Sequence, residues 1–312
     1  MTKVFIDGRE GTTGLRIYER LTGREDIELI LIDEAKRKDP QARKECLNQA
    51  DIAILCLPDA AAQESVSLID QPNTRVLDTS TAHRTLADWA YGFPELSPEH
   101  LKAIQRGKRV AVPGCHASGF IALAYPLVQE GLVSSEEGLY CHSITGYSGG
   151  GKKMIAQYEA QGRDIELDSP RQYGLTQQHK HLKEMAAISG LKELPIFCPI
   201  VSDFYSGMLV TVPLWGKGKG LTVEKLRSLY AEHYANQPFI HVYTEEETQA
   251  LGGFAAGNSL SQRDGMEIII SGNDDRILTM ARFDNLGKGS SGAAVQCLNL
   301  MMGVPMTTGL AL

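Results

Sequence analysis

The chain has 312 residues, a formal net charge of −7 at pH 7, and 43% hydrophobic residues. This length is enough for two domains, each with its own core. The mildly acidic balance disfavours nucleic acid and anionic membrane surfaces as partners, and no apolar run approaches the roughly 18 residues of a membrane-spanning helix. Any anionic ligand must therefore be held by a local pocket.

The cysteines indicate the compartment. The first predicted strand begins at residue 3 with no secretory segment before it, and the sequence has no CxxC pair. This pattern is typical of reduced thiols in a cytoplasmic protein and not of a disulfide framework. The six cysteines are Cys46, Cys56, Cys115, Cys141, Cys198 and Cys297.

The first half of the chain alternates short apolar runs with helix-like stretches. Strands are predicted over residues 3–6, 27–32, 51–57, 75–77 and 110–112, and helices over 14–21 and 60–69. Several of these strands are continuously apolar, as expected for strands that are buried on both faces. The alternation predicts an α/β fold with a Rossmann-type, doubly wound parallel sheet.

A glycine-rich turn follows the first strand. Gly8, Gly11 and Gly14 form a GxxGxxG pattern that opens the first helix, with Thr12 and Thr13 between the last two glycines. Glycine lets the backbone approach a pyrophosphate, and the helix N-terminus supplies N–H donors. The strand–turn–helix setting predicts a dinucleotide site, and a tight turn without a ligand is the alternative.

The end of the second strand bears on which dinucleotide binds. Asp33 and Glu34 resemble the acidic residues that bind the ribose 2′-hydroxyl of NAD. The basic run over residues 36–38, which includes Arg37, is suited to the 2′-phosphate of NADP. We expect NADP(H), and a solvated charged loop is the alternative.

Cys115 is the first candidate for a catalytic residue. It follows Pro113-Gly114 and precedes a small-residue segment and an apolar run over residues 120–128, which places its thiol at or near a helix N-terminus. There the unpaired N–H groups and the helix dipole favour the thiolate, the form that attacks carbonyl or acyl-phosphate carbon. The alternative is a buried cysteine that packs as a small hydrophobe.

After about residue 140 the pattern changes to a run of strands with few helices. Strands are predicted over residues 140–145, 197–202, 208–213, 240–243, 266–271 and 276–283. This run favours a predominantly antiparallel second domain, with an amphipathic helix capped by Thr222. The chain closes with a small-residue helix over 289–302. If that helix packs on the first domain, the first domain comprises residues 1–115 and 287–312, and residues 116–286 form the catalytic domain.

A second glycine-rich loop follows the strand over residues 140–145. Residues 146–153 include Ser148, Gly149 and two lysines. Exposed N–H groups beside a hydroxyl and ammonium groups are suited to a phosphate or carboxylate, although the spacing is not that of a nucleotide P-loop. A flexible loop between strand and helix is the alternative.

Two histidines and a carboxylate lie close together near residue 180. If a helix starts near His179, then His181 and Glu184 lie three apart on one face and His179 points elsewhere. A carboxylate orients an imidazole and raises its pKa, which suits a general acid/base beside a thiolate. This favours His181 with Glu184 as its orienter, whereas a loop start at His179 reverses the choice. A zinc site lacks a second ligand pair, and exposed histidines at a helix start are the other alternative.

Seven spaced motifs extend over the chain. They are the glycine pattern at 8–14, Asp78–Arg84, Tyr91–Leu96, Pro113–Cys115, the serine–glycine loop at 148–151, the Tyr173…His179-x-His181-x-x-Glu184 block and Asp284–Gly289. With these motifs the sequence resembles the N-acetyl-γ-glutamyl-phosphate reductases, and among them the shorter of two types. The wider superfamily is that of the glyceraldehyde-3-phosphate and aspartate-semialdehyde dehydrogenases.

The resemblance implies a fold and a reaction. A Rossmann domain closed by the C-terminal helix is joined to a mixed α/β catalytic domain. The Cys115 thiolate attacks the acyl phosphate and expels inorganic phosphate, and NADPH delivers hydride to the resulting thioester. The thiohemiacetal then collapses to N-acetylglutamate 5-semialdehyde, in arginine biosynthesis. The acid/base role falls to the His179/His181 pair, and the family pattern does not say which one acts.

The resemblance also implies binding residues and an assembly. Ser148 and Gly149 match substrate-contacting positions, and Tyr173 matches a site-lining position. Arg84 matches a position expected to bind the anionic end of the substrate, although the short-type sequence departs from the long type there. A homodimer or homotetramer is implied, with no metal.

Three other functions fit parts of the sequence. The first is the same reduction on aspartyl phosphate or a lysine-pathway acyl phosphate, because discriminating one methylene is worth only about 1–3 kcal/mol. The second is a regulator that senses NADP without turnover, although a sensor has no use for both Cys115 and the histidine cluster. A metal-dependent hydrolase built on His179 and His181 is the third.

Overall fold

The computed structural model describes residues 1–312, which form two compact units. Unit 1 comprises Met1–Pro113 and Ser290–Leu310, and unit 2 comprises Gly114–Gly289 and Ala311–Leu312. Unit 1 is therefore built from two separate stretches of the chain. That residues 1–115 with 287–312, and residues 116–286, are separate domains stays a prediction.

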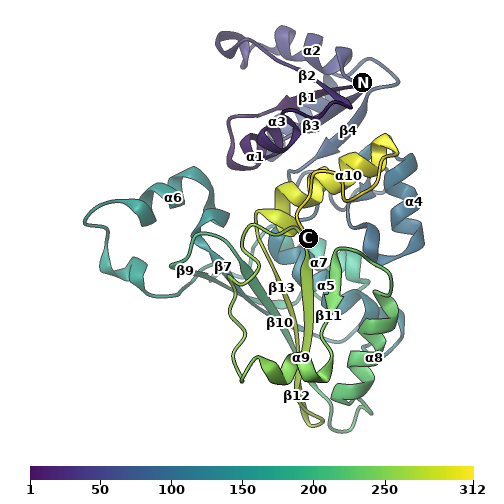
Figure 1. Ribbon diagram of the computed structural model, residues 1–312, viewed down its shortest axis with the longest axis vertical. Helices are drawn as coiled ribbons and strands as arrows, with labels where there is room; N and C mark the ends of the chain where they lie inside the picture. Colours follow the sequence, from purple (N-terminus) through teal and green to yellow (C-terminus); the bar gives the residue numbers. More distant parts are fainter. The chain divides into compact units, whose positions relative to one another are not determined.

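Unit 1 contains a six-stranded sheet with strand order β2-β1-β3-β4-β6-β5, in which every pairing is parallel. Figure 1 labels β1, β2, β3 and β4 of this sheet. The strands are β1 (Thr2–Asp7), β2 (Ile27–Ile30), β3 (Ile52–Leu55), β4 (Arg75–Asp78), β5 (Ala90–Tyr91) and β6 (Arg109–Ala111). The helices are α1 (Thr12–Leu21), α2 (Pro40–Gln49), α3 (Asp59–Ser67), α4 (Pro98–Arg106) and α10 (Gly292–Met302). The predicted doubly wound parallel sheet is confirmed.

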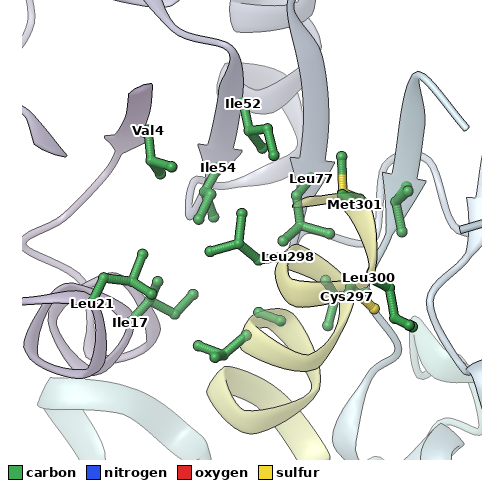
Figure 2. Close-up of a cluster of buried hydrophobic side chains, with 14 of the residues drawn as sticks. Val4, Ile17, Leu21, Ile52, Ile54, Leu77, Cys297, Leu298, Leu300 and Met301 are labelled. Atoms are coloured by element: carbon green, nitrogen blue, oxygen red, sulfur yellow. The ribbon is translucent and has the colours of Figure 1, made fainter. Parts of the chain in front are cut away.

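Two hydrophobic clusters lie on opposite faces of this sheet. Ile54 of β3 belongs to the cluster that contains Leu298 of α10, and Figure 2 shows these side chains together. Ala53, the neighbouring residue of β3, belongs to the other cluster, with Leu47 of α2 and Ala62 of α3. Successive strand residues point to opposite faces, so a continuously apolar strand supplies both clusters. The closing helix packs on the first sheet, as predicted.

Unit 2 contains a seven-stranded sheet with strand order β11-β12-β13-β10-β7-β9-β8. The strands are β7 (Tyr140–Gly146), β8 (Arg171–Gln172), β9 (Ile196–Ser202), β10 (Met208–Trp215), β11 (Ile240–Val242), β12 (Met266–Asn273) and β13 (Arg276–Phe283). The β7–β9 and β11–β12 pairings are parallel, and the other four are antiparallel. The sheet is therefore mixed and predominantly antiparallel.

Unit 2 also contains five helices. They are α5 (Cys115–Gln129), α6 (Gly151–Glu159), α7 (His181–Ser189), α8 (Val223–His233) and α9 (Glu245–Ala250), of which α5, α8 and α9 contact the sheet and α7 contacts α5. Gly119 allows α5 to lie close to the sheet, because a Cβ there would stand 2.5 Å from Val210 Cγ2 and 2.8 Å from Phe283 Cε1. The start of α5 is therefore held against the sheet.

Some elements differ from the prediction. The second strand ends at Ile30, and the closing helix starts at Gly292 after a π-helical turn over Gly287–Ser291. Short 3-10 turns cover Glu34–Lys36, Pro94–Leu96, Tyr147–Gly150 and Ile165–Asp168. Helix α2 was not predicted from the hydrophobic pattern, because only two of its residues are buried. The signals for its start were Asp39, which caps it, and Pro40, its first residue. None of the helices has the length and apolar character that crossing a bilayer requires.

Candidate active site

Cys115 is the first residue of α5. Gly114 is the N-cap residue and has an extended backbone, with φ −77° and ψ 148°. The thiol therefore lies at a helix N-terminus, as predicted, and it is partly exposed. The first N–H groups of a helix have no partner within it, so this position favours a negative charge on sulfur.

A buried carboxylate holds the backbone immediately before Cys115. Glu184, on α7, is 2% exposed and accepts a hydrogen bond from the Gly114 N–H at 2.8 Å. This bond ties the first turn of α7 to the first turn of α5. Sequence spacing did not indicate the Gly114 contact, and the predicted role of Glu184 as orienter of His181 stays a prediction.

The two predicted histidines lie at the start of α7. The helix begins at His181, and His179 lies in the loop before it. His179 Nδ1 accepts a hydrogen bond from the His181 N–H at 3.2 Å, so the neutral ring of His179 carries its proton on Nε2. Burial and the nearby Lys180 both lower the pKa of His179, which favours that neutral ring. No group of three or more His, Cys, Asp or Glu side chains is arranged to hold a metal ion.

His116 lies at the centre of this cluster, although the sequence pattern did not single it out. Its side chain is buried, and its ring centroid is 5.9 Å from that of His179 and 5.7 Å from that of His181. Its Nδ1 lies 2.7 Å from Ser143 Oγ, and its Nε2 lies 2.6 Å from Tyr173 Oη. Tyr173 therefore lies in the same cluster as the histidines. The side chains of β7 alternate between the two faces of the sheet, which places Ser143 on the same buried face as Cys141 and Thr145. This alternation could have indicated Ser143 as a buried polar residue.

Burial sets the charge of His116. Loss of solvation, followed by the effect of His179, lowers the pKa of His116 to about 3. The ring is therefore neutral over the working range of most enzymes. A neutral ring has one N–H donor and one acceptor, which its two hydroxyl partners must share.

The second glycine-rich loop, over residues 146–153, is connected to Cys115 through the turn over residues 284–289. Asn285 Nδ2 donates a hydrogen bond to Ser148 Oγ at 3.0 Å, and a Cβ on Gly149 would lie 3.5 Å from the same Nδ2. The Asp284 carbonyl accepts a hydrogen bond from the Gly289 N–H at 3.0 Å, and a Cβ on Gly289 would stand 3.0 Å from Cys115 Cβ. Ser148 is thus joined to the residue that packs on the nucleophile.

Unit 1 has a cavity of about 510 Å³ beside the glycine-rich turn. Gly8, Gly11, Glu34, Arg37 and Lys38 are among its lining residues. A Cβ on Gly8, where φ is +86°, would stand 2.4 Å from the Cys56 carbonyl oxygen. A glycine-lined cavity next to the start of α1, with two exposed cations at its edge, fits the phosphates of a dinucleotide.

Three other residues of the predicted fingerprint lie at the start of α1. Thr12 is its first residue, and Thr13 Oγ1 lies 3.2 Å from Ser290 Oγ, within unit 1. A Cβ on Gly14 would stand 2.4 Å from the Gly8 carbonyl oxygen. Gly14 therefore allows close packing of the helix against the turn, which is a structural requirement of the motif.

Arg84 is buried in unit 1. It donates hydrogen bonds to the backbone carbonyls of Val112 at 2.8 Å and Thr79 at 2.9 Å. In the same motif His83 Nδ1 lies 2.6 Å from an Asp78 carboxylate oxygen. These contacts give the motif a structural role within unit 1, and substrate binding by Arg84 stays a prediction.

Family comparisons match most of the chain. Residues 3–104 match the family described as "Semialdehyde dehydrogenase, NAD binding domain", and residues 115–285 match "Semialdehyde dehydrogenase, dimerisation domain". A protein of Nostoc sp. named N-acetyl-gamma-glutamyl-phosphate reductase 2 is 43% identical over 318 residues, covering 99% of both chains. The N-acetyl-gamma-glutamyl-phosphate reductase of Chelativorans sp. is 46% identical over 315 residues, covering 96% of this chain and 98% of its own.

Solved structures share the fold at low sequence identity. Aspartate semialdehyde dehydrogenase II from Vibrio cholerae has a TM-score of 0.71 and 14% identity, covering 97% of this chain and 99% of its own. Aspartate semialdehyde dehydrogenase from Francisella tularensis has a TM-score of 0.69 and 16% identity, covering 97% and 100%. Identities this low show a shared two-unit α/β fold only.

Replacing His116 with glutamine should make the protein less sensitive to acid. The pKa of His116 is about 3 when folded, against 6.5 for an ordinary histidine. Between these values the unfolded chain binds more protons, so the contribution of this group is complete above pH 6.5 and is lost as the pH falls toward 3. From pH 6 to pH 4, the free energy of unfolding of the unmodified protein should fall by about 1 kcal/mol per pH unit more than that of His116→Gln. Urea denaturation across this range measures the difference, and equal slopes would contradict it.

Proposed function

The chain belongs to the N-acetyl-gamma-glutamyl-phosphate reductase family, and on this premise we propose that it reduces N-acetyl-γ-glutamyl phosphate to N-acetylglutamate 5-semialdehyde. The reaction would be its step in arginine biosynthesis. One observation supports it most. Cys115 is the first residue of α5, and the N–H of the preceding residue, Gly114, donates a hydrogen bond to Glu184 on α7, the helix that begins at His181. A nucleophile, a titratable base and a dinucleotide cavity are the parts that acyl-phosphate reduction requires.

The first step is attack by the Cys115 thiolate on the acyl carbon of the substrate. The sulfur–carbon bond forms, the bond from that carbon to the phosphate oxygen breaks, and inorganic phosphate leaves with the electron pair. When bound, NADPH supplies hydride to the thioester carbonyl carbon. The oxyanion left at this carbon takes a proton from the acid/base residue and becomes the thiohemiacetal. Collapse of the thiohemiacetal then gives the hydroxyl proton back to that residue, breaks the sulfur–carbon bond and returns Cys115 as the thiolate. The helix N-terminus stabilises that thiolate at both ends of the cycle.

We assign the acid/base role to His181. The start of α7 at His181 leaves His179 in a loop, which on helix geometry alone would favour His179. Two observations favour His181 instead. His179 Nδ1 is occupied by a backbone N–H, and the lowered pKa of that ring disfavours the protonated form that an acid needs. His181 shares the first turn of α7 with Glu184, which is bonded to the residue before the nucleophile.

The cofactor is proposed to be NADP(H). Arg37 and Lys38 line the cavity beside the glycine-rich turn, and guanidinium and ammonium groups are suited to a 2′-phosphate. Glu34 also lines the cavity and could accept a hydrogen bond from a ribose hydroxyl. In the segment that follows β2, two cations, Arg37 and Lys38, and one carboxylate, Glu34, line the cavity, which favours the phosphorylated cofactor.

Substrate binding is proposed for Ser148 and Gly149, with Tyr173 lining the site. Ser148 is buried, and Asn285 fixes its hydroxyl, so its orientation is set before any ligand arrives. Arg84 would contribute only if its guanidinium can exchange a backbone carbonyl for the substrate. All six cysteines are free thiols, which supports a reducing cytoplasmic location.

A homodimer is proposed through the open face of the seven-stranded sheet. Residues 115–285 match a family described as a dimerisation domain. Large apolar side chains on this face are exposed, among them Tyr140 at 51%, Ile196 at 52% and Trp215 at 63%. Tyr140 and Ile196 are neighbours in the β7–β9 register and lie on the face opposite to α5. An apolar sheet face of this kind marks an interaction site.

The reaction is tested by following NADPH formation in reverse, from N-acetylglutamate 5-semialdehyde, phosphate and NADP⁺. We expect phosphate-dependent turnover that Cys115→Ser lowers at least 1,000-fold, because serine is a far weaker nucleophile, with NADP⁺ affinity unchanged. Aspartate semialdehyde serves as the competing substrate. Activity with aspartate semialdehyde alone would keep the mechanism and change the substrate. A Cys115→Ser variant that keeps several per cent of activity would refute covalent catalysis.

Comparing His181→Asn with His179→Asn tests the acid/base assignment. His181→Asn should lower kcat by about 10²- to 10⁴-fold, because it removes proton transfer, and it should flatten the pH–rate profile. His179→Asn should lower kcat about 10-fold or less and keep the shape of the profile, because the asparagine oxygen can still accept the His181 N–H. The reverse order of the two losses would assign the role to His179.

Replacing Arg37 with alanine tests the cofactor assignment. The variant should raise the KM for NADPH about 10-fold or more and leave the KM for NADH nearly unchanged, because only NADPH carries the 2′-phosphate. Lys36→Ala is the matched control, since Lys36 is exposed in the same basic run and does not line the cavity. Equal effects of Arg37→Ala on both cofactors would rule out a 2′-phosphate contact.

The dimer is tested by light scattering coupled to size exclusion. Trp215→Lys should shift the protein from dimer toward monomer at micromolar concentration, because it places a charge in an apolar interface. The control is Leu86→Lys, which changes an exposed leucine of unit 1 and should leave the mass unchanged. A dimer that is insensitive to Trp215→Lys would place the interface elsewhere.

A further inference from the structure

Two hydroxyl groups share the buried imidazole of His116. Ser143 Oγ lies 2.7 Å from Nδ1, and Tyr173 Oη lies 2.6 Å from Nε2. Ser143 is completely buried within β7, whereas Tyr173 is only partly buried. In each case the imidazole is the hydrogen-bond partner that the structure gives to the hydroxyl. The three groups form one line, Ser143–His116–Tyr173.

The hydrogen bonds along this line can run in two directions, either from Ser143 toward Tyr173 or from Tyr173 toward Ser143, and counting the protons distinguishes them. A neutral imidazole carries one proton, and each hydroxyl carries one, so two hydrogen bonds use two of the three protons. If Tyr173 donated to Nε2, then Nδ1–H would donate to Ser143, and the Ser143 proton would be buried without an acceptor. If Ser143 donates to Nδ1, then Nε2–H donates to Tyr173, and the unused proton is that of the Tyr173 phenol. The second direction places the unused proton on the partly exposed Tyr173 and not on the fully buried Ser143, which makes it the favoured direction.

We propose that Ser143 and His116 are positioning residues that fix Tyr173 as a hydrogen-bond donor directed away from His116 and into the active site. The proposal rests on the reaction assigned above. Tyr173 would donate to the acyl oxygen, which becomes negatively charged when the Cys115 thiolate adds to the carbonyl carbon. No proton is transferred in this step. The phenol stabilises the oxyanion, and the charge returns to the leaving group when the intermediate collapses.

The residues around Ser143, His116 and Tyr173 keep the Tyr173 phenol protonated and the His116 ring in one orientation. Burial, then the nearby Cys115 and Cys141, raise the pKa of Tyr173, so the phenol keeps its proton. Aromatic contacts hold the His116 ring on the other sides: its centroid is 5.2 Å from that of Phe197, and it has an edge contact with His179. The ring is thus prevented from turning over to exchange its two partners.

The direction of the line can be observed without any substrate. The protein is labelled with ¹⁵N at histidine ring nitrogens, and the His116 signals are identified by their loss in His116→Gln. We expect Nε2 to carry the proton and Nδ1 to be unprotonated at every pH from 6 to 9. Ser143→Ala should abolish this preference, giving a mixture or the opposite tautomer. A proton on Nδ1 in the unmodified protein, or titration of His116 in this range, would overturn the proposal.

Kinetics then test the effect on catalysis. Ser143→Ala and Tyr173→Phe should each lower kcat by about 10-fold or more with little change in KM, and the double variant should lose no more than Tyr173→Phe alone. Ser189→Ala is the matched control, because Ser189 is equally buried, lies on α7 and is outside the line; it should leave kcat unchanged. Additive losses, or a Ser143→Ala variant with full kcat, would refute the proposal. Failure of the reaction assignment would appear separately, as an absence of turnover with a normal His116 tautomer.

Discussion

The hydrogen bond from the Gly114 backbone to the Glu184 carboxylate is the contact on which the candidate active site depends. It spans 70 positions of sequence and joins the N-cap of the cysteine-bearing helix to the first turn of the histidine-bearing helix. A buried carboxylate is stable only when its lone pairs have donors, so this hydrogen bond holds the two helix starts together. Tight packing at Gly119 and Gly289 then leaves Cys115 little freedom to move from this position.

Burial gives the imidazoles of the cluster different tasks. His116 is made neutral by its loss of solvation, and it serves as a fixed connection between two hydroxyl groups. His179 Nδ1 accepts a hydrogen bond from the first residue of α7, and we therefore propose His181, which shares the first turn of that helix with Glu184, for proton transfer. Three similar side chains within 6 Å of one another can thus differ in function because their hydrogen-bond partners differ.

The parts of the structure that follow local rules were predictable, and those that depend on long-range packing were not. Continuous apolar runs indicated the parallel sheet, and the Pro113-Gly114 turn indicated the helix N-terminus at Cys115. The parallel pairing of β7 with β9 could not be predicted, because strand partners are chosen by the packing of the whole sheet. His116 and Ser143 were missed for the same reason, since 27 positions separate them and only the fold brings them together. Arg84 shows the converse, because a matched motif did not reveal that backbone carbonyls hold its guanidinium.

The central claim is that Cys115 carries the acyl group during the reaction, and trapping that species tests it most directly. The protein is mixed with N-acetyl-γ-glutamyl phosphate in the absence of NADPH, quenched in acid and analysed by mass spectrometry of its peptides. The account predicts one N-acetylglutamyl group attached to the peptide that contains Cys115, released by hydroxylamine and by addition of NADPH before quenching. An unmodified Cys115 peptide under conditions in which phosphate is released, or an acyl group on another residue, would contradict it.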